Sequence, residues 1–266
     1  YLVSPLQFQY LEHKGPKMAL KYGDQWAVYN AQGSFPVSFP YDSVQLLSDE
    51  IAILFRDDEI YASFSSDTLV DISDAEDLKL LSDFSMTEEE GPRTAYLLLR
   101  TGRNTYKAYN ADGLPILSGR YTSVEALGRE YLLVQRSGKK GLYHKSGEAV
   151  LKTQYAAIGN YNDGYVSTLL NGRFGIYNYN RDLLLSAKYE KRLQPYGRDY
   201  FIGVRNNKSA IIDLENDNVT GFVFDQIEYW NDSSALVLRD DRWSVYDIGA
   251  GETAYDEIDE YRILHE

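Results

Sequence analysis

The chain has 266 residues and no cysteine, which excludes disulfides and thiol chemistry and leaves the cellular compartment open. It also lacks any run near the roughly 18 consecutive apolar residues of a membrane span. Basic residues are few, since 27 Lys and Arg stand against 40 Asp and Glu, a formal net charge of −13. So acidic a chain repels phosphate backbones and contains no basic run, so nucleic-acid binding is not expected.

Catalytic and metal-binding motifs are missing as well. The nucleophile elbow G-x-S-x-G, the phosphate loop G-x-x-x-x-G-K-[ST] and the calcium loop D-x-[DN]-x-[DN]-G do not occur. The three histidines are far apart in the repeat described below, so no zinc site is expected. The sequence thus predicts a protein that is not an enzyme and uses no cofactor or metal. The histidines are His13, His144 and His265.

What the chain does contain is a five-residue phrase that occurs seven times. The step is 34 or 35 residues, except for one of 45 between Tyr61 and Tyr106. The clearest copies are Trp26-Ala27-Val28-Tyr29-Asn30, Phe174-Gly175-Ile176-Tyr177-Asn178 and Trp243-Ser244-Val245-Tyr246-Asp247. A fixed period of this size indicates repeated supersecondary units that share a continuous core. The copies begin at Trp26, Tyr61, Tyr106, Lys140, Phe174, Ser209 and Trp243.

Each unit reads as four short β-strands. In residues 155–188 four β-rich runs are separated by turn residues, and the 24 tyrosines of the chain suit a pleated surface. Asn171-Gly172 is a strong signal for a type I′ hairpin between the second and third runs. The sequence therefore predicts an all-β fold of seven tandem four-stranded antiparallel units of about 34 residues, in a single domain over 1–266. The same hairpin slot holds Ser137-Gly138, Asn206-Asn207 and Asp240-Asp241.

Seven such units predict a seven-bladed β-propeller, in which each sheet packs on the next and no long edge is exposed. An open β-repeat solenoid is the alternative. The long step between Tyr61 and Tyr106 predicts a protruding acidic loop at 82–92. Residues 255–264 repeat the pattern of the first strand and predict an extra C-terminal strand, which could latch a ring.

Two positional signatures recur in the units. An aromatic followed three residues later by Val or Ile marks the first strand, as in Tyr155…Ile158. The second residue of the phrase is small, as in Gly175, which predicts close approach of a neighbouring sheet. Lys107 breaks this pattern. The small residues are Ala27, Ala62, Gly141, Gly175, Ala210 and Ser244.

The pattern resembles the WG-repeat family of bacterial proteins. The closest match is Ser137-Gly138-Lys139-Lys140-Gly141-Leu142-Tyr143, followed by His144-Lys145-Ser146-Gly147 and Glu148-Ala149-Val150-Leu151. The resemblance spans residues 6–264; the units around 41–75 and 189–223 are degenerate. It implies a β-repeat scaffold at the bacterial envelope or surface and brings no catalytic residues. We expect a periplasmic, outer-membrane-associated or extracellular location, with any signal or lipid anchor removed before this numbering.

Clusters of charge are interpreted as structure first. Acidic pairs and runs suit solvated turns, with a calcium site or a paired-carboxylate hydrolase as alternatives. Four cations, each one residue before a phrase, form a basic arc that pairs with acidic neighbours or, alternatively, holds an anion. The acidic groups are Asp57-Asp58, Glu88-Glu89-Glu90, Asp240-Asp241 and Asp256-Glu257, and the cations are Lys139, Arg173, Lys208 and Arg242.

Packing and turn formation account for the residues of the phrase. We therefore expect the functional residues where the repeat is broken. Those places are the insertion near Glu88, the degenerate unit from Tyr189, and aromatics outside the repeat frame. The main hypothesis is a non-catalytic scaffold for protein–protein interaction, and the alternative is a glycan-binding module using rim aromatics. The out-of-frame aromatics are Tyr179, Tyr196, Tyr200, Tyr229 and Trp230.

Overall fold

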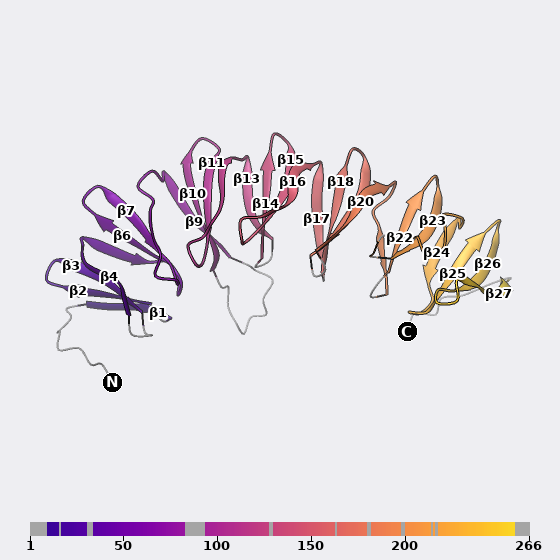
Figure 1. Cartoon of the computed structure of the whole chain (residues 1–266), viewed down its shortest axis with the longest axis horizontal. Coiled ribbons are helices and arrows are strands. Elements are labelled where there is room, and N and C mark those ends of the chain that lie inside the picture. Colours follow the sequence, from indigo (N-terminus) through magenta and orange to yellow (C-terminus); the bar gives the residue numbers. More distant parts are fainter. Residues whose placement is uncertain are drawn as a thin grey trace. The chain divides into compact units, whose positions relative to one another are not determined.

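The computed structural model describes residues 10–15, 17–30, 34–82, 94–127, 130–162, 164–179, 182–197, 200–213, 215 and 218–258. These residues form 27 strands in seven antiparallel sheets and no helix (Figure 1). In the same ranges no helix is long and apolar enough to cross a membrane. The predicted all-β fold of seven tandem units is confirmed, and closure into a ring stays a prediction from their number.

The chain divides into two compact units, residues 1–153 and 154–266, with the boundary inside β16. Sheet 1 contains β1 (Tyr10–Lys14), β2 (Lys17–Tyr22), β3 (Gln25–Asn30) and β4 (Ser34–Tyr41). Sheet 2 contains β5 (Ser43–Leu46), β6 (Ala52–Arg56), β7 (Glu59–Ser63) and β8 (Leu69–Asp71). Sheet 3 contains β9 (Asp77–Ser82), β10 (Thr94–Gly102), β11 (Thr105–Asn110) and β12 (Pro115–Arg120). Sheet 4 contains β13 (Ser123–Leu127), β14 (Tyr131–Arg136), β15 (Lys139–His144) and β16 (Ala149–Tyr155).

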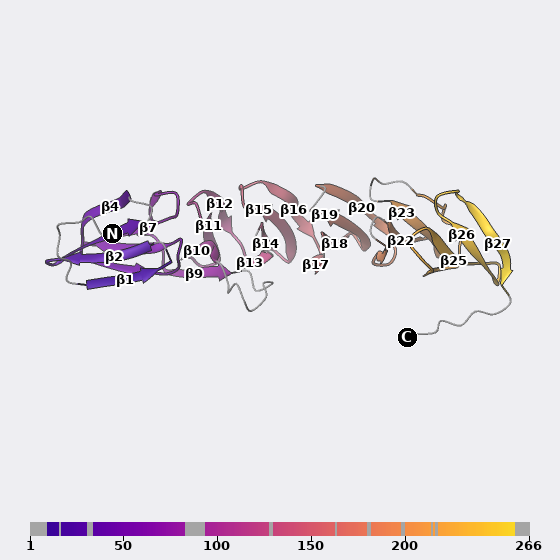
Figure 2. The same cartoon turned by 90° about the horizontal axis from the view of Figure 1, so that it is seen from below.

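The second unit holds the last three sheets, which Figure 2 shows in salmon to yellow. Sheet 5 contains β17 (Ala157–Asn162), β18 (Tyr165–Leu170), β19 (Arg173–Asn178) and β20 (Leu183–Tyr189). In the residues that the structure describes, sheet 6 contains three strands, β21 (Gln194–Tyr196), β22 (Tyr200–Arg205) and β23 (Lys208–Asp213). Sheet 7 contains β24 (Gln226–Tyr229), β25 (Ser234–Arg239), β26 (Arg242–Asp247) and β27 (Glu252–Ile258).

The predicted hairpins between second and third strands are confirmed. Asn171 and Gly172 have φ values of 52° and 74°, and Asn206 and Asn207 have 52° and 58°. Both central residues of a type I′ turn need positive φ, which Asn, Asp and Gly tolerate. These turns set the register of each β-meander. The remaining predicted pairs, Ser137-Gly138 and Asp240-Asp241, have positive φ at both residues as well.

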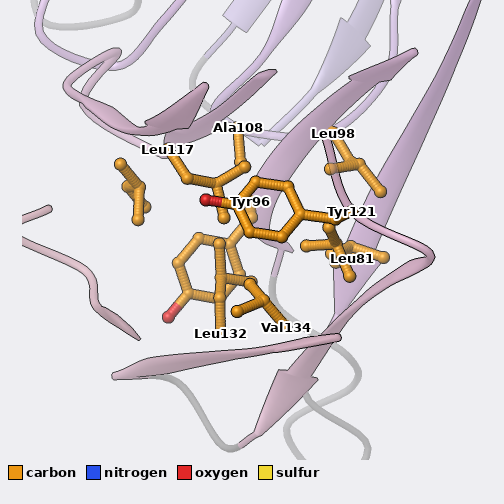
Figure 3. Packing of buried hydrophobic residues seen from close by; sticks show 10 residues of the cluster. Leu81, Tyr96, Leu98, Ala108, Leu117, Tyr121, Leu132 and Val134 are labelled. Atoms are coloured by element: carbon orange, nitrogen blue, oxygen red, sulfur yellow. The ribbon is translucent and has the colours of Figure 1, made fainter. Parts of the chain in front are cut away.

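Within each unit, hydrophobic cores lie between neighbouring sheets. In the core between sheets 5 and 6, Phe174 and Ile176, the first and third residues of their phrase, pack from one side, and Ala210 and Ile212, the second and fourth residues of the next phrase, pack from the other. Burial of each such side chain contributes roughly 1.5–3 kcal/mol. Figure 3 shows one of these cores, in which residues of sheet 3 pack against those of sheet 4. Its members include Leu81, Tyr96, Leu98, Ala108, Leu117, Tyr121, Leu132 and Val134.

The aromatic signature spans a corner between sheets instead of lying within a first strand. Tyr155 ends β16, whereas Ile158 lies in β17. Tyr189 likewise ends β20 and is 1% exposed. The buried aromatic therefore closes one sheet while the apolar residue opens the next, and at Tyr155 the step of three residues spans a corner of one residue, Ala156.

The reason predicted for the small second residue is wrong at the two glycines where it can be checked. A Cβ on Gly175 would lie 2.5 Å from the carbonyl oxygen of Leu185 in β20 of the same sheet. A Cβ on Gly141 would lie 2.9 Å from the carbonyl oxygen of Leu151 in β16. The crowding thus comes from the sheet's own fourth strand, which bulges across β19 between Phe174 and Ile176. Lys107 is tolerated because its partner Ser118 continues the register without a break.

In sheet 2 the frame is shifted by one residue. Arg56 pairs with Glu59 as Arg136 pairs with Lys139 in sheet 4. Ile60, not Tyr61, therefore has the first position of the third strand. Ala62 accordingly packs in the core towards sheet 3 and does not have the small second position.

Sheets 1 and 2 are joined by a buried lysine that the repeat pattern does not reveal. Lys17 is 2% exposed, and its Nζ donates to Ser63 O and Ser63 Oγ, both at 3.2 Å, and to Phe64 O at 2.9 Å. Burial lowers the pKa of Lys17 to about 8, against the opposing charges of Asp67 and Glu50. With three acceptors for its three donors in a closed site, Lys17 is a structural group.

Two segments that the sequence predicts to depart from the repeat lie partly outside the described residues. Residues 83–92 of the predicted acidic loop lie outside the described residues, whereas Ser82 is the last residue of β9. At the C-terminus, Tyr255 and Ile258 lie in β27, which is the fourth strand of sheet 7 and pairs with β26. They are therefore not the first strand of a further unit, and residues 259–264 of the predicted extra strand lie outside the described residues.

Candidate binding groove

The repeat is broken most clearly at sheet 6, where the described residues contain no fourth strand. Residues 218–224 run beside β23 in an irregular path. Val219 N donates to Ile211 O at 2.9 Å, and Ser209 N donates to Phe224 O at 2.7 Å. Ile211 N donates to the side-chain oxygen of Thr220 at 3.0 Å. The edge of β23 is thereby bonded without a regular strand.

A groove of about 890 Å³ lies beside this segment, within the second unit. One wall is the irregular segment, and the other is formed by β26, its two flanking turns and the start of β27. We call it the sheet 6–7 groove. Its lining residues are Thr220, Val223, Phe224, Arg239, Asp240, Arg242, Trp243, Ser244, Tyr246, Gly251, Glu252 and Thr253.

The groove has an aromatic floor with charge at its ends. Phe224 and Tyr246 pack edge to face with ring centroids 5.6 Å apart. Both rings are buried, and burial raises the pKa of Tyr246. Arg239 and Arg242 flank the hairpin before β26, whereas Glu252 follows the turn after it. The hairpin end of the groove therefore presents two guanidinium groups together with the Asp240 carboxylate, and the turn after β26 presents the Glu252 carboxylate.

Val223 supplies an exposed apolar position on the groove wall. Its side chain is 39% exposed, which is high for a valine in a domain with an ordered core. Arg239 Nε lies 3.6 Å from Asp240 Oδ2, an exposed pair of the kind that contributes little to stability. The groove thus offers Trp, Tyr and Arg, the side chains that most often dominate protein interfaces.

The out-of-frame aromatics do not gather into one surface. Tyr179 and Tyr200 are half-buried, and Tyr196 is only 1% exposed. Tyr229 and Trp230 are 57% and 53% exposed. The expected rim of five aromatics is therefore reduced to one exposed pair at the end of β24.

Tyr196 instead joins sheet 6 to sheet 7. Its hydroxyl donates to Ser234 O at 2.5 Å, lies 3.3 Å from Asn231 O, and accepts from Trp230 N at 3.4 Å. Tyr229 packs on its ring with centroids 5.2 Å apart. Burial raises the pKa of Tyr196. The exposed aromatic pair thus rests on a buried tyrosine that fixes its backbone.

Two of the acidic pairs, Asp57-Asp58 and Asp240-Asp241, belong to turns as predicted, whereas Asp256-Glu257 lies in a strand. Asp57 has a φ of 52°, and its N–H donates to Asp42 Oδ2 at 2.7 Å. Asp240 has a φ of 51°, and its N–H donates to Asp225 Oδ2 at 3.2 Å. Across the described part of the chain no three His, Asp or Glu side chains gather as metal ligands. Asp256 and Glu257 lie in β27, and Glu88, Glu89 and Glu90 lie outside the described residues.

Two cations of the basic arc are paired with acids, as the main interpretation predicted. Arg173 lies 3.0 Å from Glu190, and Lys208 lies 2.6 Å from Asp225. Both carboxylates also accept hairpin N–H groups, from Asn206 and Asn207 in the case of Glu190. Lys139 is exposed, and Arg242 lines the groove.

These bonds lower the pKa of both acids. For Glu190 the largest causes are the N–H groups of Asn207 and Asn206, followed by Arg173. For Asp225 they are Lys208 and then the Asp240 N–H. Sequence reasoning missed these partners, although a signal existed: each acid directly follows the corner aromatic, as in Tyr189-Glu190 and Phe224-Asp225.

The histidines stay apart in the described part of the chain. His13 is exposed, and His265 lies outside the described residues. His144 Nδ1 is 2.8 Å from Ser146 Oγ, and its Nε2 is 3.5 Å from Glu130. This histidine therefore belongs to a turn at the end of β15.

Neither a protein-family model nor a curated protein matches the chain. Among solved structures, the computationally designed Ika8 protein has 10% identity and a TM-score of 0.29, over 93% of this chain and 85% of that one. Hsv2p of Kluyveromyces lactis has 11% identity and a TM-score of 0.27, over 79% and 75%. PorZ, a bacterial surface component of the type-IX secretion system of Porphyromonas gingivalis, has 11% identity and a TM-score of 0.29, over 94% of this chain and 38% of PorZ.

Proposed function

We propose that the protein is a non-catalytic repeat scaffold that binds a protein partner through the sheet 6–7 groove. The observation that carries the proposal is that the sheet with a missing strand adjoins a groove lined by Trp243, Tyr246 and two arginines. Residues 218–224 follow an irregular path beside β23, and the groove between them and β26 gives another polypeptide a surface that includes aromatic and guanidinium groups.

The partner segment fits the groove best as an extended strand with an apolar side chain for the aromatic floor. A carboxylate near Arg239 and Arg242 and a cation near Glu252 would complement its two ends. The location at a bacterial envelope or surface is part of the proposal, and it rests on the resemblance to WG-repeat proteins. The exclusion of catalysis rests on the absence of catalytic motifs from the sequence.

The test is site-specific photo-crosslinking in cells of the source organism. A photoreactive residue at Ser244, in the groove, is compared with one at Ser186, exposed on β20 of sheet 5. We expect one protein to be captured from Ser244 and not from Ser186. Capture of the same proteins from both positions would contradict the groove as the binding site.

Substitutions at two exposed apolar residues, one in the groove and one outside it, then show how the groove affects the affinity for the captured protein. Val223→Asp places a charge on the groove wall, whereas Leu184→Asp, at a residue 48% exposed on sheet 5, is the matched control. We expect Val223→Asp to weaken binding at least about tenfold, since a desolvated charge costs more than 1.4 kcal/mol. Equal effects of the two variants would count against the proposal.

A glycan-binding function is the second candidate, and the exposed pair of Tyr229 and Trp230 favours it. Tyr229 is held by a hydrogen bond from its hydroxyl to Asp232 at 2.9 Å, so its ring is preorganised. A glycan array probed with the protein and with Trp230→Ala tests this function. Tyr22→Ala, at an aromatic 53% exposed in sheet 1, is the control. An array without hits would remove the candidate and leave the protein-binding proposal untouched.

A further inference from the structure

At one corner between sheets, a threonine stands where three other corners have an acidic residue. Where the chain passes from one sheet to the next, the residue after the aromatic donates its N–H to the second strand of the new sheet. Asp42 donates to Phe55 O, Glu190 to Val204 O and Asp225 to Leu238 O, each at 2.8 Å. This shared register makes the three acids equivalent. Thr122 has the same place, since its N–H donates to Gln135 O at 2.7 Å.

At the three acidic corners the carboxylate binds the hairpin of the new sheet. It accepts from Asp57 N at 2.7 Å, from Asn206 N at 2.9 Å, and from Asp240 N at 3.2 Å. The acids thus act as internal anions for hairpin N–H groups that strand pairing leaves unused.

At the Thr122 corner the hairpin remains but the internal anion is gone. Ser137 and Gly138 have φ values of 50° and 74°, which match Asn206 and Asn207 closely in backbone shape. Thr122 Oγ1 lies 3.1 Å from Gln135 O and points its short side chain at that carbonyl. A threonine hydroxyl carries no charge and cannot replace a carboxylate at the hairpin.

Three arginines gather where the acid is missing. They line a cavity of about 480 Å³ at this corner, within the first unit. Arg103 comes from the β10–β11 hairpin, Arg120 ends β12, and Arg136 ends β14. No acidic residue is among the lining residues, which are Arg103, Asn104, Arg120, Tyr121, Thr122, Arg136 and Ser137.

These arginines differ from others in the protein. Arg56, Arg100 and Arg173 each lie within 3.0 Å of a carboxylate. In the described part of the chain, none of the three arginines at the Thr122 corner has a carboxylate within salt-bridge distance. With 40 acidic against 27 basic residues in the chain, three unpaired guanidinium groups around one cavity are unexpected unless an anion binds there.

The loss of the acid alone does not create such a site. Ala156 follows Tyr155 at another corner and also has no carboxylate. There the arginine beside the hairpin, Arg173, is paired with Glu190. In the described part of the chain, the missing acid and the unpaired arginines coincide at the Thr122 corner.

We propose that the Thr122 corner binds a dianionic oxyanion of the phosphate class. Three guanidinium forks and the Ser137 N–H offer more donors than one carboxylate accepts, and they suit the several oxygens of a phosphoryl group. The cavity has room for a group attached to the phosphate, so the source is either free phosphate or a phosphate monoester. The bound anion takes the place that Glu190 and Asp225 have at their corners.

The experiment is an NMR and calorimetric titration of the full chain with inorganic phosphate. We expect saturable binding with amide shifts concentrated at Thr122 and Ser137, and acetate at equal concentration should bind more weakly. Parallel titration with phosphoserine distinguishes the two sources, since tighter binding than phosphate assigns the site to an ester. Shifts spread over the surface, or acetate binding equal to that of phosphate, would overturn the proposal.

Variants separate the site from general charge. Arg103→Gln, Arg120→Gln and Arg136→Gln should each weaken phosphate binding at least about tenfold, the value of one lost charge-assisted hydrogen bond. Arg173→Gln removes one positive charge elsewhere and should leave the affinity unchanged. Equal losses of affinity in all four variants would mean that phosphate is attracted by the overall charge, and would contradict the proposed site.

The decisive variant is Thr122→Glu, which restores the repeat's own acid. Its carboxylate should occupy the hairpin as Glu190 does, so phosphate binding should be lost and the melting temperature should rise. Unchanged phosphate affinity in Thr122→Glu would show that the anion does not bind where the acid is missing.

Discussion

Sheets 5 and 6 come from consecutive copies of the same unit and differ in their fourth strand. In sheet 5, β20 pairs with β19 and bulges over Gly175, which has no room for a Cβ. In sheet 6 the segment 218–224 takes the place of that strand, and the equivalent position is Ala210, which is fully buried. In sheets 5 and 6 this position therefore differs in how closely the neighbouring backbone approaches it.

The comparison also shows how a repeat protein tolerates a missing strand. The irregular segment bonds the edge of β23, and Tyr196 ties sheet 6 to sheet 7. The acids Glu190 and Asp225 hold the hairpins on either side. These contacts keep the edge of β23 bonded although no regular fourth strand is described there, and the sheet 6–7 groove lies beside the irregular segment.

The largest loss of stability is expected when a side chain is added at Gly175, the small second position of the phrase in sheet 5. In Gly175→Ala the new methyl group meets the Leu185 carbonyl and the Ala187 N–H, which are backbone groups that cannot rotate away. We expect a loss of roughly 2–3 kcal/mol in the free energy of unfolding. Urea denaturation followed by circular dichroism measures it.

The matched change in sheet 6 is the reverse substitution. Ala210→Gly removes a buried methyl group where no bulged strand crosses, and we expect a cost of about 1 kcal/mol. If Ala210→Gly proves as costly as Gly175→Ala, the approach of the neighbouring backbone does not decide the cost at this position, and the comparison fails.

A smaller effect is expected at the link between sheets 6 and 7. Tyr196→Phe removes the 2.5 Å hydrogen bond to Ser234 O, which keeps Asn231 N as a donor at 3.1 Å, and it leaves Trp230 N without its acceptor. A buried polar group left unsatisfied costs about 1–2 kcal/mol, and the emission of Trp230 should shift as its backbone loosens. Tyr229→Phe, which removes an exposed hydrogen bond to Asp232, should change stability by less than about 0.5 kcal/mol. Similar losses of stability in both variants would contradict the conclusion that Tyr196 joins sheet 6 to sheet 7.

The smallest expected effect is a dependence of stability on pH, which arises at the corner before sheet 6 and not at the corner before sheet 5. The corner before sheet 6 carries Glu190, whose pKa is lowered in the folded protein by hairpin N–H groups, whereas the corner before sheet 5 carries Ala156. A lowered folded pKa stabilises the protein above the unfolded value of about 4.3, and this stabilisation is lost as the pH falls through the folded pKa. Denaturation midpoints between pH 3 and pH 7 should therefore fall less steeply for Glu190→Gln than for the wild type. The exposed Glu215→Gln is the control, and equal slopes in all three proteins would argue against this role of Glu190.

The period and the turns could be read from the sequence because they depend on neighbouring residues. Asn171-Gly172 and Asn206-Asn207 adopt positive φ for local steric reasons, so the hairpins and their spacing follow directly. The corner aromatics were found but assigned to the wrong strand. Tyr155 closes one sheet and Ile158 opens the next, and no local pattern states where one strand ends across a corner of a single residue.

The binding sites were predicted only as places where the repeat is broken. That reasoning located the degenerate unit from Tyr189, which is sheet 6, but not the groove beside it. It also favoured a rim of aromatics, of which Tyr196 turns out to be buried. The arginines at the Thr122 corner escaped notice because they are 16 or 17 residues apart in the chain and meet only when sheets 3 and 4 pack together.

The sequence by itself determined an all-β protein of seven similar units, since hydrophobic alternation, turn residues and a constant period are local properties that recur. The tertiary structure decided which small residues face a bulged strand, which acids bind which hairpins, and where a groove lies beside an irregular segment or a cavity beside a missing acid. Those outcomes depend on contacts between residues from different strands. Packing across sheets, and not propensity along the chain, therefore sets the two sites proposed for this protein.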